Sequence, residues 1–144
     1  MKHIYVVYWS GTGNTKKMAE AVAEGVKSQG IEVRLVGVED ASVADIINAS
    51  AVALGCPSMG AEVLEETYME PFIAELERTA HASKPLALFG SYDWGGGEWM
   101  RDWEKRMTGC AFNLIAEGLI VRNEPSTESS KLCQSLGAKL AGSL

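Results

Sequence analysis

The sequence predicts an α/β fold in which a doubly wound parallel sheet carries helices on both faces. Short apolar runs alternate five times with longer segments whose apolar residues recur every three or four positions. No repeat, low-complexity stretch or linker interrupts the alternation, and 144 residues suit one compact domain spanning residues 1–144. Chains with this pattern form parallel sheets whose strands are joined by right-handed crossovers.

The expected strands are short runs of β-branched, aromatic and other apolar residues. The first run, Ile4–Tyr8, is apolar throughout, which is typical of a central strand covered on both faces. Pro57 stops the third strand, and we expect the fifth strand to be irregular at Glu117–Gly118. The five strands are Ile4–Tyr8, Ile31–Val38, Ala51–Cys56, Leu86–Ser91 and Phe112–Val121.

The expected helices follow these strands one by one. In the first helix, Asn14–Gln29, apolar residues recur at every fourth position, and Gly30 is typical of the residue just past a helix end. Ser126 or Thr127 is the expected N-cap of the last helix. The later helices are Val43–Asn48, Leu64–Arg78, Trp99–Met107 and Ser126–Leu140.

The loop after the first strand has the composition of a phosphate-binding site. It consists of Ser10, Gly11, Thr12, Gly13, Asn14 and Thr15. Its hydroxyl and amide side chains offer hydrogen bonds, and its glycines let successive backbone N–H groups point inward. The positive end of the following helix faces the same space. An anion would be held there mainly by dipoles.

The spacing within this loop excludes the common nucleotide-binding motifs. The loop lacks the Walker A gap between its glycines and a Lys-Ser/Thr pair, and Lys16 stands where the dinucleotide fingerprint has its third glycine. With these two motifs excluded, the composition of the loop suits a phosphate monoester. The alternative is an ordinary strand-to-helix turn in which a Ser or Thr side chain caps the helix.

Two further loops are expected at the same edge, because ligands of open parallel sheets lie beyond the carboxyl ends of the strands. These loops are Pro57–Glu62 and Tyr92–Gly97. Met59 and Trp94 bring a polarisable sulfur and a flat ring near the proposed phosphate site, and Trp94 has little beside it to pack against. The loops therefore predict a ligand with a flat aromatic ring.

The composition excludes several classes of function. The formal net charge of −6 argues against a nucleic-acid partner. No run reaches the length of about 18 apolar residues that would span a membrane, so we expect a cytoplasmic protein. Cys56, Cys110 and Cys133 lack metal-ligand spacing and are expected to be reduced thiols. Cys56 and Cys110 also lack the Arg six positions on that a small phosphatase needs.

The acidic residues are concentrated in one part of the chain. From Leu35 to Glu77 there is no Lys or Arg. The acidic residues in this segment are Glu39, Asp40, Asp45, Glu62, Glu65, Glu66, Glu70, Glu75 and Glu77. One face should therefore be strongly negative, either as a docking surface for a basic partner or as an ordinary solvated surface.

Three segments together resemble the flavodoxins, specifically the short-chain type of anaerobic bacteria. They are YWSGTGNT at residues 8–15, SMGAE at residues 58–62 and FGSYDWG at residues 89–95. The resemblance implies a flavodoxin-like five-stranded sheet of order 2-1-3-4-5 and one non-covalently bound FMN. It also implies a low-potential one-electron carrier, not an enzyme, that cycles between semiquinone and hydroquinone.

The resemblance further implies a role for each loop. Residues 10–15 would hold the FMN phosphate, Met59 would lie on the inner face of the flavin ring, and Trp94 would cover the outer face. Gly60 would let the peptide after Met59 turn its carbonyl toward the reduced ring, while Glu62 would brace this loop and accept a hydrogen bond from the ring edge. The implied cofactor contacts are Ser10, Gly11, Thr12, Gly13, Asn14, Thr15, Ser58, Met59, Gly60, Ala61, Glu62, Ser91, Tyr92, Asp93, Trp94 and Gly95.

The chain departs from the family pattern at two positions, and alternatives stay open. Ala61 stands where a polar or acidic residue is common, and Asp93 where glycine is common. An FMN-dependent NAD(P)H:quinone-type reductase is the main alternative. A phosphoacceptor domain is disfavoured, because Ser10 and Cys56 stand where acidic residues would have to gather. The implied partners of the monomeric carrier are redox enzymes with basic docking patches, such as ferredoxin-type reductases or oxidoreductases.

Overall fold

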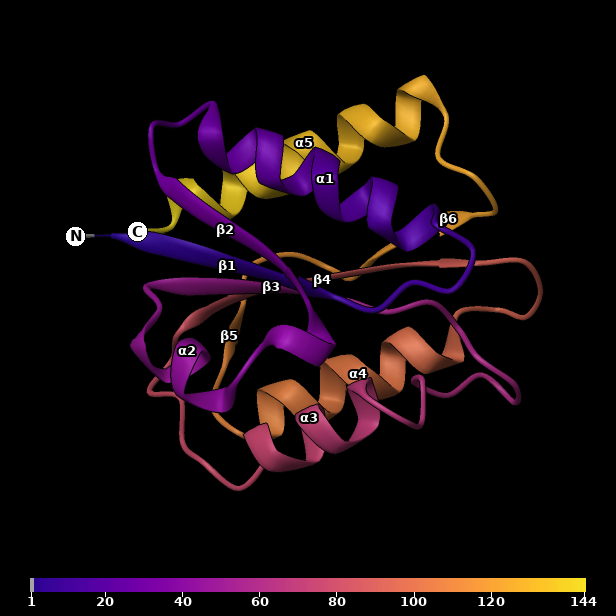
Figure 1. Ribbon diagram of the computed structural model, residues 1–144, viewed down its shortest axis with the longest axis horizontal. Helices are drawn as coiled ribbons and strands as arrows, with labels where there is room; N and C mark the ends of the chain where they lie inside the picture. The colour runs from indigo at the N-terminus through magenta and orange to yellow at the C-terminus, as the bar shows by residue number, and fades with distance from the viewer. Residues whose placement is uncertain (1) are drawn as a thin grey trace.

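A central parallel sheet lies between two layers of helices in a computed structural model that describes residues 2–144. Met1, the first residue of the expected domain, lies outside the described residues. Helices α1 (Asn14–Lys27) and α5 (Thr127–Gly142) cover one face of the sheet. Helices α2 (Val43–Asn48), α3 (Met69–Leu76) and α4 (Glu98–Gly109) cover the other (Figure 1).

The strand order confirms the predicted topology. The strands run β2-β1-β3-β4-β5, and every pairing between them is parallel. A short strand, β6, pairs with β4 beside β5. The strands are β1 His3–Tyr8, β2 Glu32–Gly37, β3 Ala51–Gly55, β4 Pro85–Tyr92, β5 Asn113–Leu114 and β6 Leu119–Arg122.

The fifth strand position is occupied by two short strands instead of one continuous strand. β5 pairs with the first two residues of β4, and β6 pairs with its last four. The predicted irregularity at Glu117–Gly118 is therefore confirmed, but the break is wider than expected and begins at Ile115. The backbone N–H of Gly118 donates to the Glu104 carboxylate of α4 at 2.6 Å, which satisfies a group that the sheet ladder leaves free.

Helix α3 is shorter than predicted. The sequence predicts a helix over Leu64–Arg78, whereas α3 runs only over Met69–Leu76. The Glu65 carboxylate accepts hydrogen bonds from the backbone N–H groups of Thr67, Tyr68 and Met69 at 2.7, 2.7 and 3.0 Å. A carboxylate bound in this way acts as a cap, so the helix begins after Glu65 instead of passing through it.

The environment of Glu65 favours its ionised form. Its side chain is only 6% exposed. Although burial by itself raises the pKa of a carboxyl group, the hydrogen bonds from the Met69, Tyr68 and Thr67 N–H groups outweigh burial and hold the pKa of Glu65 below its usual value. Ionised Glu65 is thus a structural anchor of the loop before α3.

The last helix begins as predicted. Ser126 accepts a hydrogen bond from the Ser129 N–H, and the Ser129 hydroxyl in turn accepts one from the Ser126 N–H. This reciprocal pair is a capping box, which confirms Ser126 of the two candidate caps.

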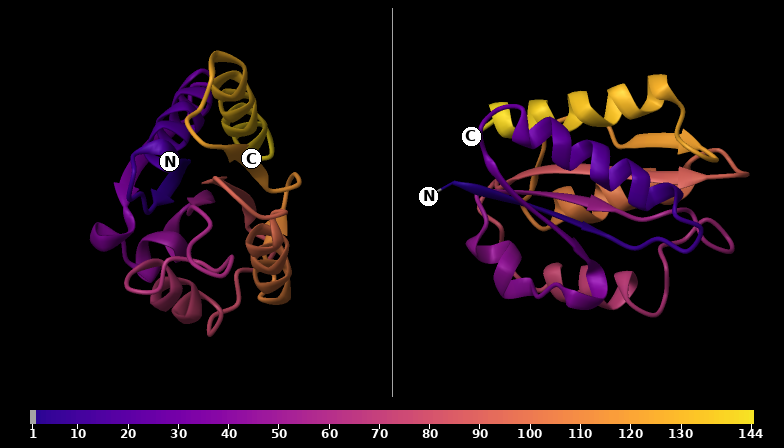
Figure 2. Two further views of the ribbon diagram at one scale, coloured as in Figure 1. Left: turned by 90° about the vertical axis from the view of Figure 1, so that its right-hand side faces the viewer. Right: turned by 45° about the horizontal axis from the view of Figure 1, so that its top comes forward.

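Helices α1 and α5 pack at unusually close range. A Cβ added at Gly25 would overlap the Gln134 carbonyl oxygen, and one added at Gly137 would overlap the Val22 carbonyl oxygen. The two glycines thus let the backbones of the two helices meet. The two helices lie side by side over one face of the sheet (Figure 2).

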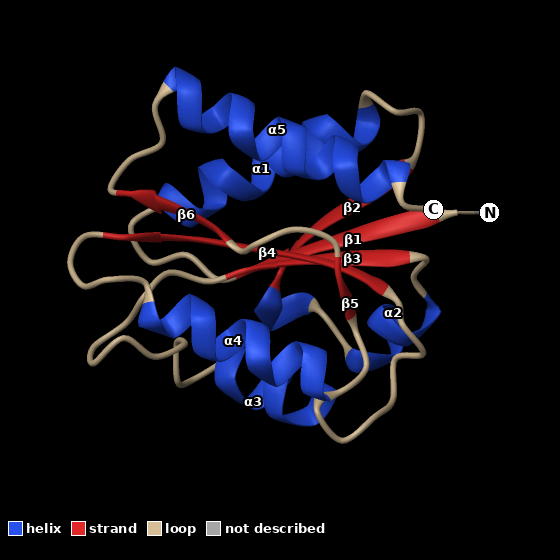
Figure 3. Cartoon of the chain, turned by 180° about the vertical axis from the view of Figure 1, so that it is seen from behind, coloured by secondary structure: helices blue, strands red, loops and turns tan. Residues whose placement is uncertain are grey.

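The loops that follow the strands gather at one edge of the sheet. Figure 3 shows them at the end of the molecule opposite the N- and C-termini. The loop after β1, the long segment between β3 and α3, the loop after β4 and the turn after β6 all lie there. No helix within residues 2–144 is both long enough and apolar enough to cross a membrane.

We expect Gly25→Ala to destabilise the protein by about 1–3 kcal/mol, because the added methyl group would force α1 and α5 apart. Gly142→Ala is the matched control, since a Cβ at Gly142 meets nothing within 4 Å. The control should change the free energy of unfolding by less than about 0.5 kcal/mol. Urea denaturation measures both, and equal stabilities of the two variants would contradict the close packing.

We expect Glu65→Gln to lower the free energy of unfolding by about 1–3 kcal/mol at neutral pH, because a neutral amide is a weaker acceptor for three N–H groups. The lowered pKa means that ionised Glu65 stabilises the fold above the unfolded value of about 4.3 and loses this effect as the pH falls through the folded value. The two proteins should therefore converge in stability as the pH falls below the unfolded value and through the lowered folded pKa of Glu65. A constant difference from pH 7 to pH 3 would contradict this account.

Candidate functional site

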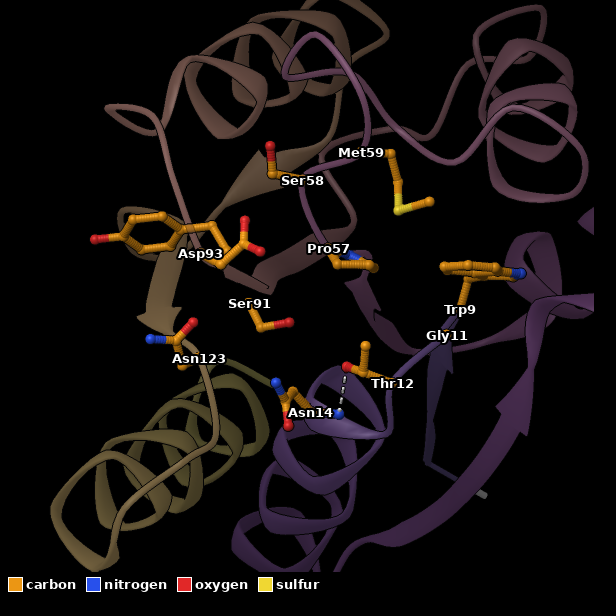
Figure 4. Close-up of a pocket in the computed structure, with 11 residues that line it drawn as sticks. Trp9, Gly11, Thr12, Asn14, Pro57, Ser58, Met59, Ser91, Asp93 and Asn123 are labelled. Atoms are coloured by element: carbon orange, nitrogen blue, oxygen red, sulfur yellow. Dashed lines mark hydrogen bonds between the residues drawn. The ribbon is translucent and has the colours of Figure 1, made fainter.

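A pocket opens where the loops converge at the carboxyl edge of the sheet. Its volume is about 440 Å³, within the usual range for small-molecule sites. Figure 4 shows Trp9 and Met59 on one side of the pocket, and Ser91, Asp93 and Asn123 on the other. The lining residues are Trp9, Gly11, Thr12, Asn14, Pro57, Ser58, Met59, Ser91, Tyr92, Asp93 and Asn123.

The loop after β1 presents backbone N–H groups that the protein leaves unpaired. Helix α1 has Gly13 as its N-cap, with a left-handed backbone (φ 100°) and no capping side chain. Among the described residues, the N–H groups of Gly11, Thr12, Thr15 and Lys16 have no hydrogen-bond partner. The loop and the first turn of α1 therefore offer a cluster of donors at the positive end of a helix, which is suited to an anion.

The side chains of this loop shape it instead of capping the helix. The Ser10 hydroxyl accepts a hydrogen bond from the Gly13 N–H at 3.0 Å, within the loop. The Thr12 hydroxyl lies 3.5 Å from the Asn14 N–H, at the limit of a hydrogen bond (Figure 4). The alternative of an ordinary turn with a Ser or Thr N-cap is wrong, because Gly13 is the N-cap.

A buried pair of hydroxyl groups links this loop to β4. Thr15 and Ser91 are 1% and 4% exposed, and their Oγ atoms lie 2.9 Å apart. One hydroxyl donates to the other, and the acceptor keeps a hydrogen of its own. Among the described residues the two hydroxyl groups have no other hydrogen-bond partner, and Ser91 lines the pocket. The pair can therefore donate one hydrogen bond to a ligand.

The loop after β3 forms a tight hairpin over the pocket. The backbone N–H of Met59 donates to the Val63 carbonyl and the Val63 N–H donates to the Met59 carbonyl, both at 2.9 Å. Gly60 has a positive φ of 49°, and a Cβ added there would meet no atom within 4 Å. Since the Met59 carbonyl is bound inside the hairpin, the Gly60 carbonyl is the first one free to act outside it.

Glu62 connects this hairpin to the third loop. Its Oε1 atom accepts hydrogen bonds from the Gly97 and Glu98 N–H groups, both at 3.0 Å. A Cβ added at Gly95 would lie 2.6 Å from the Glu62 Cδ atom, so the glycine makes room for the carboxylate. Two of the three loops are thus held together by one side chain.

The loop after β4 contributes flat and polar groups. Tyr92 and Asp93 line the pocket, and the Tyr92 ring lies against the buried Trp99 ring with centroids 5.8 Å apart. The Trp94 indole is 57% exposed and lies outside the pocket lining. Asp93 does not have a positive φ, so its backbone is not in the left-handed conformation that favours glycine.

The pocket unites residues from all three predicted loops, but not every predicted residue. The predicted residues that line it are Gly11, Thr12, Asn14, Ser58, Met59, Ser91, Tyr92 and Asp93. Ser10 and Gly13 line a neighbouring cavity, while Gly60 and Ala61 line another with Met59. Thr15, Glu62, Trp94 and Gly95 lie in the same loops outside the lining.

Sequence reasoning missed Trp9, Pro57 and Asn123 as lining residues. Asn123 has a positive φ of 60°, and its N–H donates to the Tyr92 carbonyl at 2.7 Å. The sequence feature that could have indicated Asn123 is its position directly after the last strand, because the carboxyl end of that strand lies at the edge of the sheet where the pocket opens. Trp9 packs over Gly11, where an added Cβ would lie 3.0 Å from the indole.

The cysteines take no visible part in this site. Cys56 and Cys133 are buried, Cys110 is half-buried, and all three are free thiols, as expected. Burial raises the pKa of Cys56 to about 12 and that of Cys133 to about 11. At neutral pH these two side chains are neutral thiols, which are poor nucleophiles.

The residues fit a ligand with a phosphate tail and a flat ring. The unpaired N–H groups and the hydroxyl pair suit the phosphate, and the apolar surface of Trp9, Pro57 and Met59 suits a ring. No Lys or Arg side chain lines the pocket. An anion bound among these residues would be held by dipoles and hydroxyl groups.

Comparisons with known proteins agree with this geometry. The protein-family model for flavodoxin matches residues 6–136. The chain is 48% identical to the flavodoxin of Clostridium beijerinckii over 136 residues, covering 94% of this chain and 97% of that one. It is 39% identical to the flavodoxin of Megasphaera elsdenii over 138 residues, covering 96% and 98%. The solution structure of two-electron reduced Megasphaera elsdenii flavodoxin superposes with a TM-score of 0.85 over 96% of this chain and 98% of that one, at 39% identity.

Proposed function

The chain belongs to the flavodoxin family, whose members bind FMN and carry electrons, and we propose that its FMN lies in the pocket at the carboxyl edge of the sheet. The observation that carries this proposal is the cluster of unpaired N–H groups between Gly11 and Lys16. These donors suit the phosphate of FMN. The whole of residues 1–144 would serve as a single FMN-binding unit.

Each loop would contact a different part of the cofactor. The residues from Ser10 to Thr15, with Ser91 behind them, would donate hydrogen bonds to the phosphate. Met59 would pack on one face of the ring. Trp94 would cover the other face, and its present exposure leaves its indole available for that contact.

When bound, FMN supplies one-electron redox chemistry, and the protein acts as a small electron carrier rather than an enzyme. We propose that its working potential is low. Glu62 and Asp93 lie in the loops of the site, and Glu39 and Asp40 line the cavity beside Ser10 and Gly13. Negative charges near the ring oppose the addition of an electron by Coulomb repulsion.

The redox partners would recognise the acidic side of the molecule. The segment from Leu35 to Glu77 contains no Lys or Arg, so a partner with a basic patch around its own redox centre would dock there. We propose that the carrier is a monomer. We also propose a cytoplasmic location, where a reducing environment would keep the three free cysteines as thiols.

The alternative of an NAD(P)H:quinone-type reductase has no observation in its favour. The curated relatives that match almost the full length of the chain are named flavodoxin, and the described residues supply no independent feature that favours the reductase.

The experiment for the proposed function is a reductive titration of the purified protein under anaerobic conditions. We expect a yellow protein whose flavin accepts two electrons at separate one-electron potentials, with the second lower than that of free FMN. NADPH added alone should not be oxidised steadily. A colourless protein that takes up no FMN, or sustained NADPH turnover with a quinone, would overturn the proposal.

We expect Trp94→Ala to bind FMN more weakly, by about 1 kcal/mol or roughly fivefold, because the indole would stack on the ring. The variant should also quench less of the FMN fluorescence. Since Trp94 is 57% exposed, its removal should leave the stability of the cofactor-free protein nearly unchanged. Equal FMN affinities of the variant and the parent would contradict stacking.

We expect Gly60→Val to narrow the gap between the two one-electron potentials. Gly60 has a φ of 49°, where a side chain costs about 1–2 kcal/mol. In the proposed function, the Gly60 carbonyl accepts a hydrogen bond from the reduced ring in this conformation, so the strain of a side chain would destabilise the reduced state. The shift would be several tens of millivolts, at 59 mV per about 1.4 kcal/mol. Unchanged potentials in a spectroelectrochemical titration would contradict this role.

A further inference from the structure

The loop after β4 is held firmly only at its two ends. At one end the Tyr92 carbonyl accepts a backbone hydrogen bond from the turn after β6, and at the other the Gly97 N–H donates to the Glu62 carboxylate. Between these ends, residues 93–96 take part in a single hydrogen bond within the described part of the chain. Trp94 lies in this stretch with an exposed indole. Its position therefore depends on that one hydrogen bond.

Three consecutive glycines follow Trp94 in this loop. Gly95 and Gly97 have positive φ values of 92° and 87°, which glycine adopts without strain. Glycine also loses more backbone freedom than any other residue when its conformation is fixed. The loop therefore needs a contact with another element to keep one conformation.

Arg101 supplies this contact from the first turn of α4. Its Nη2 atom donates to the Gly96 carbonyl and to the Glu98 Oε1 atom, both at 2.8 Å. The guanidinium lies along the glycines, since a Cβ added at Gly97 would lie 3.5 Å from its Nη1 atom. Side chains on a helix point back toward its start, so the fourth residue of α4 can reach the carbonyl of Gly96 before the helix begins.

The place of Arg101 is unfavourable for the helix alone. A cation in the first turn of a helix opposes the positive end of the helix dipole. The Glu98 carboxylate offsets this charge and orients the guanidinium, and their hydrogen bond lowers the pKa of Glu98. What Arg101 adds to the structure is the hydrogen bond to the glycine loop.

We propose that Arg101 is a positioning residue that holds the Gly95–Gly97 backbone and thereby keeps the Trp94 indole in place to cover the flavin ring. This inference rests on the proposed function, in which Trp94 stacks on one face of FMN. With the Gly96 carbonyl bound, the loop has less conformational freedom to lose when the cofactor binds. Without Arg101, the ordering of the loop offsets part of the stacking free energy, and FMN binds more weakly.

The experiment compares Arg101→Met with Lys105→Met. Each variant removes one exposed cation from α4, and Lys105 also contributes to the lowered pKa of Glu98. The Lys105 side chain makes no hydrogen bond within residues 2–144, so its variant is the charge control. We expect Arg101→Met to bind FMN about threefold more weakly than the parent, as for the loss of an exposed hydrogen bond from a charged group. Lys105→Met should bind FMN as the parent does.

A double-mutant cycle with Trp94→Ala tests whether Arg101 acts through the indole. Arg101→Met should weaken FMN binding by about threefold in the parent and leave the affinity of the Trp94→Ala protein unchanged. An equal loss in both backgrounds, no loss in the parent, or the same loss in Lys105→Met would overturn the coupling. Because the Arg101 side chain is 53% exposed, its replacement should leave the chain folded.

NMR relaxation of the full chain without FMN tests the loop contact by itself. The backbone order parameters of Gly95 and Gly96 should be lower in Arg101→Met than in the parent and in Lys105→Met. Equal order parameters in the three proteins would overturn the contact. A protein that takes up no FMN would overturn the proposed function and the coupling with it, while the order parameters would still decide whether Arg101 holds the loop.

Discussion

The need of backbone N–H groups for acceptors at the start of each helix is the constraint on which this structure depends. Helix α2 is capped by Ser42 and α5 by Ser126, each through its own capping box. Helices α3 and α4 receive the carboxylates of Glu65 and Glu62. Among the helices of residues 2–144, α1 alone has neither a capping side chain nor an acidic residue in its own first turn. In the proposed function, the phosphate of FMN would be the acceptor that this position lacks.

The same constraint explains how the site is built from separate loops. Two of the acceptors, Glu62 and Glu65, belong to one segment between β3 and α3, so this segment is attached to the starts of two helices. A hairpin attached in this way can present Met59 and Gly60 to a ligand without a rigid element of its own. The buried Thr15–Ser91 hydroxyl pair adds a link between α1 and β4. The loops of the proposed cofactor site are therefore linked to one another and to the helices by hydrogen bonds.

The alternating periodicity of the sequence predicts a parallel sheet, and the rule for carboxyl edges predicts the positions of the loops and much of the pocket. The strand order is predicted by the resemblance to the flavodoxins. The sequence does not predict contacts made over long sequence distances. The pattern of apolar residues favours a helix from Leu64, whereas the hydrogen bonds of Glu65 delay α3 to Met69. Likewise, nothing in the local sequence indicates that Glu62 caps α4.

The most direct measurement of the central claim compares the affinity of the cofactor-free protein for FMN with its affinity for riboflavin, which has the same ring but no phosphate. Fluorescence quenching reports both. If unpaired N–H groups hold the phosphate, FMN should bind at least about a hundredfold more tightly, which corresponds to about 2.7 kcal/mol. Equal affinities for the two compounds would show that the loop after β1 is not a phosphate site, and would contradict the account.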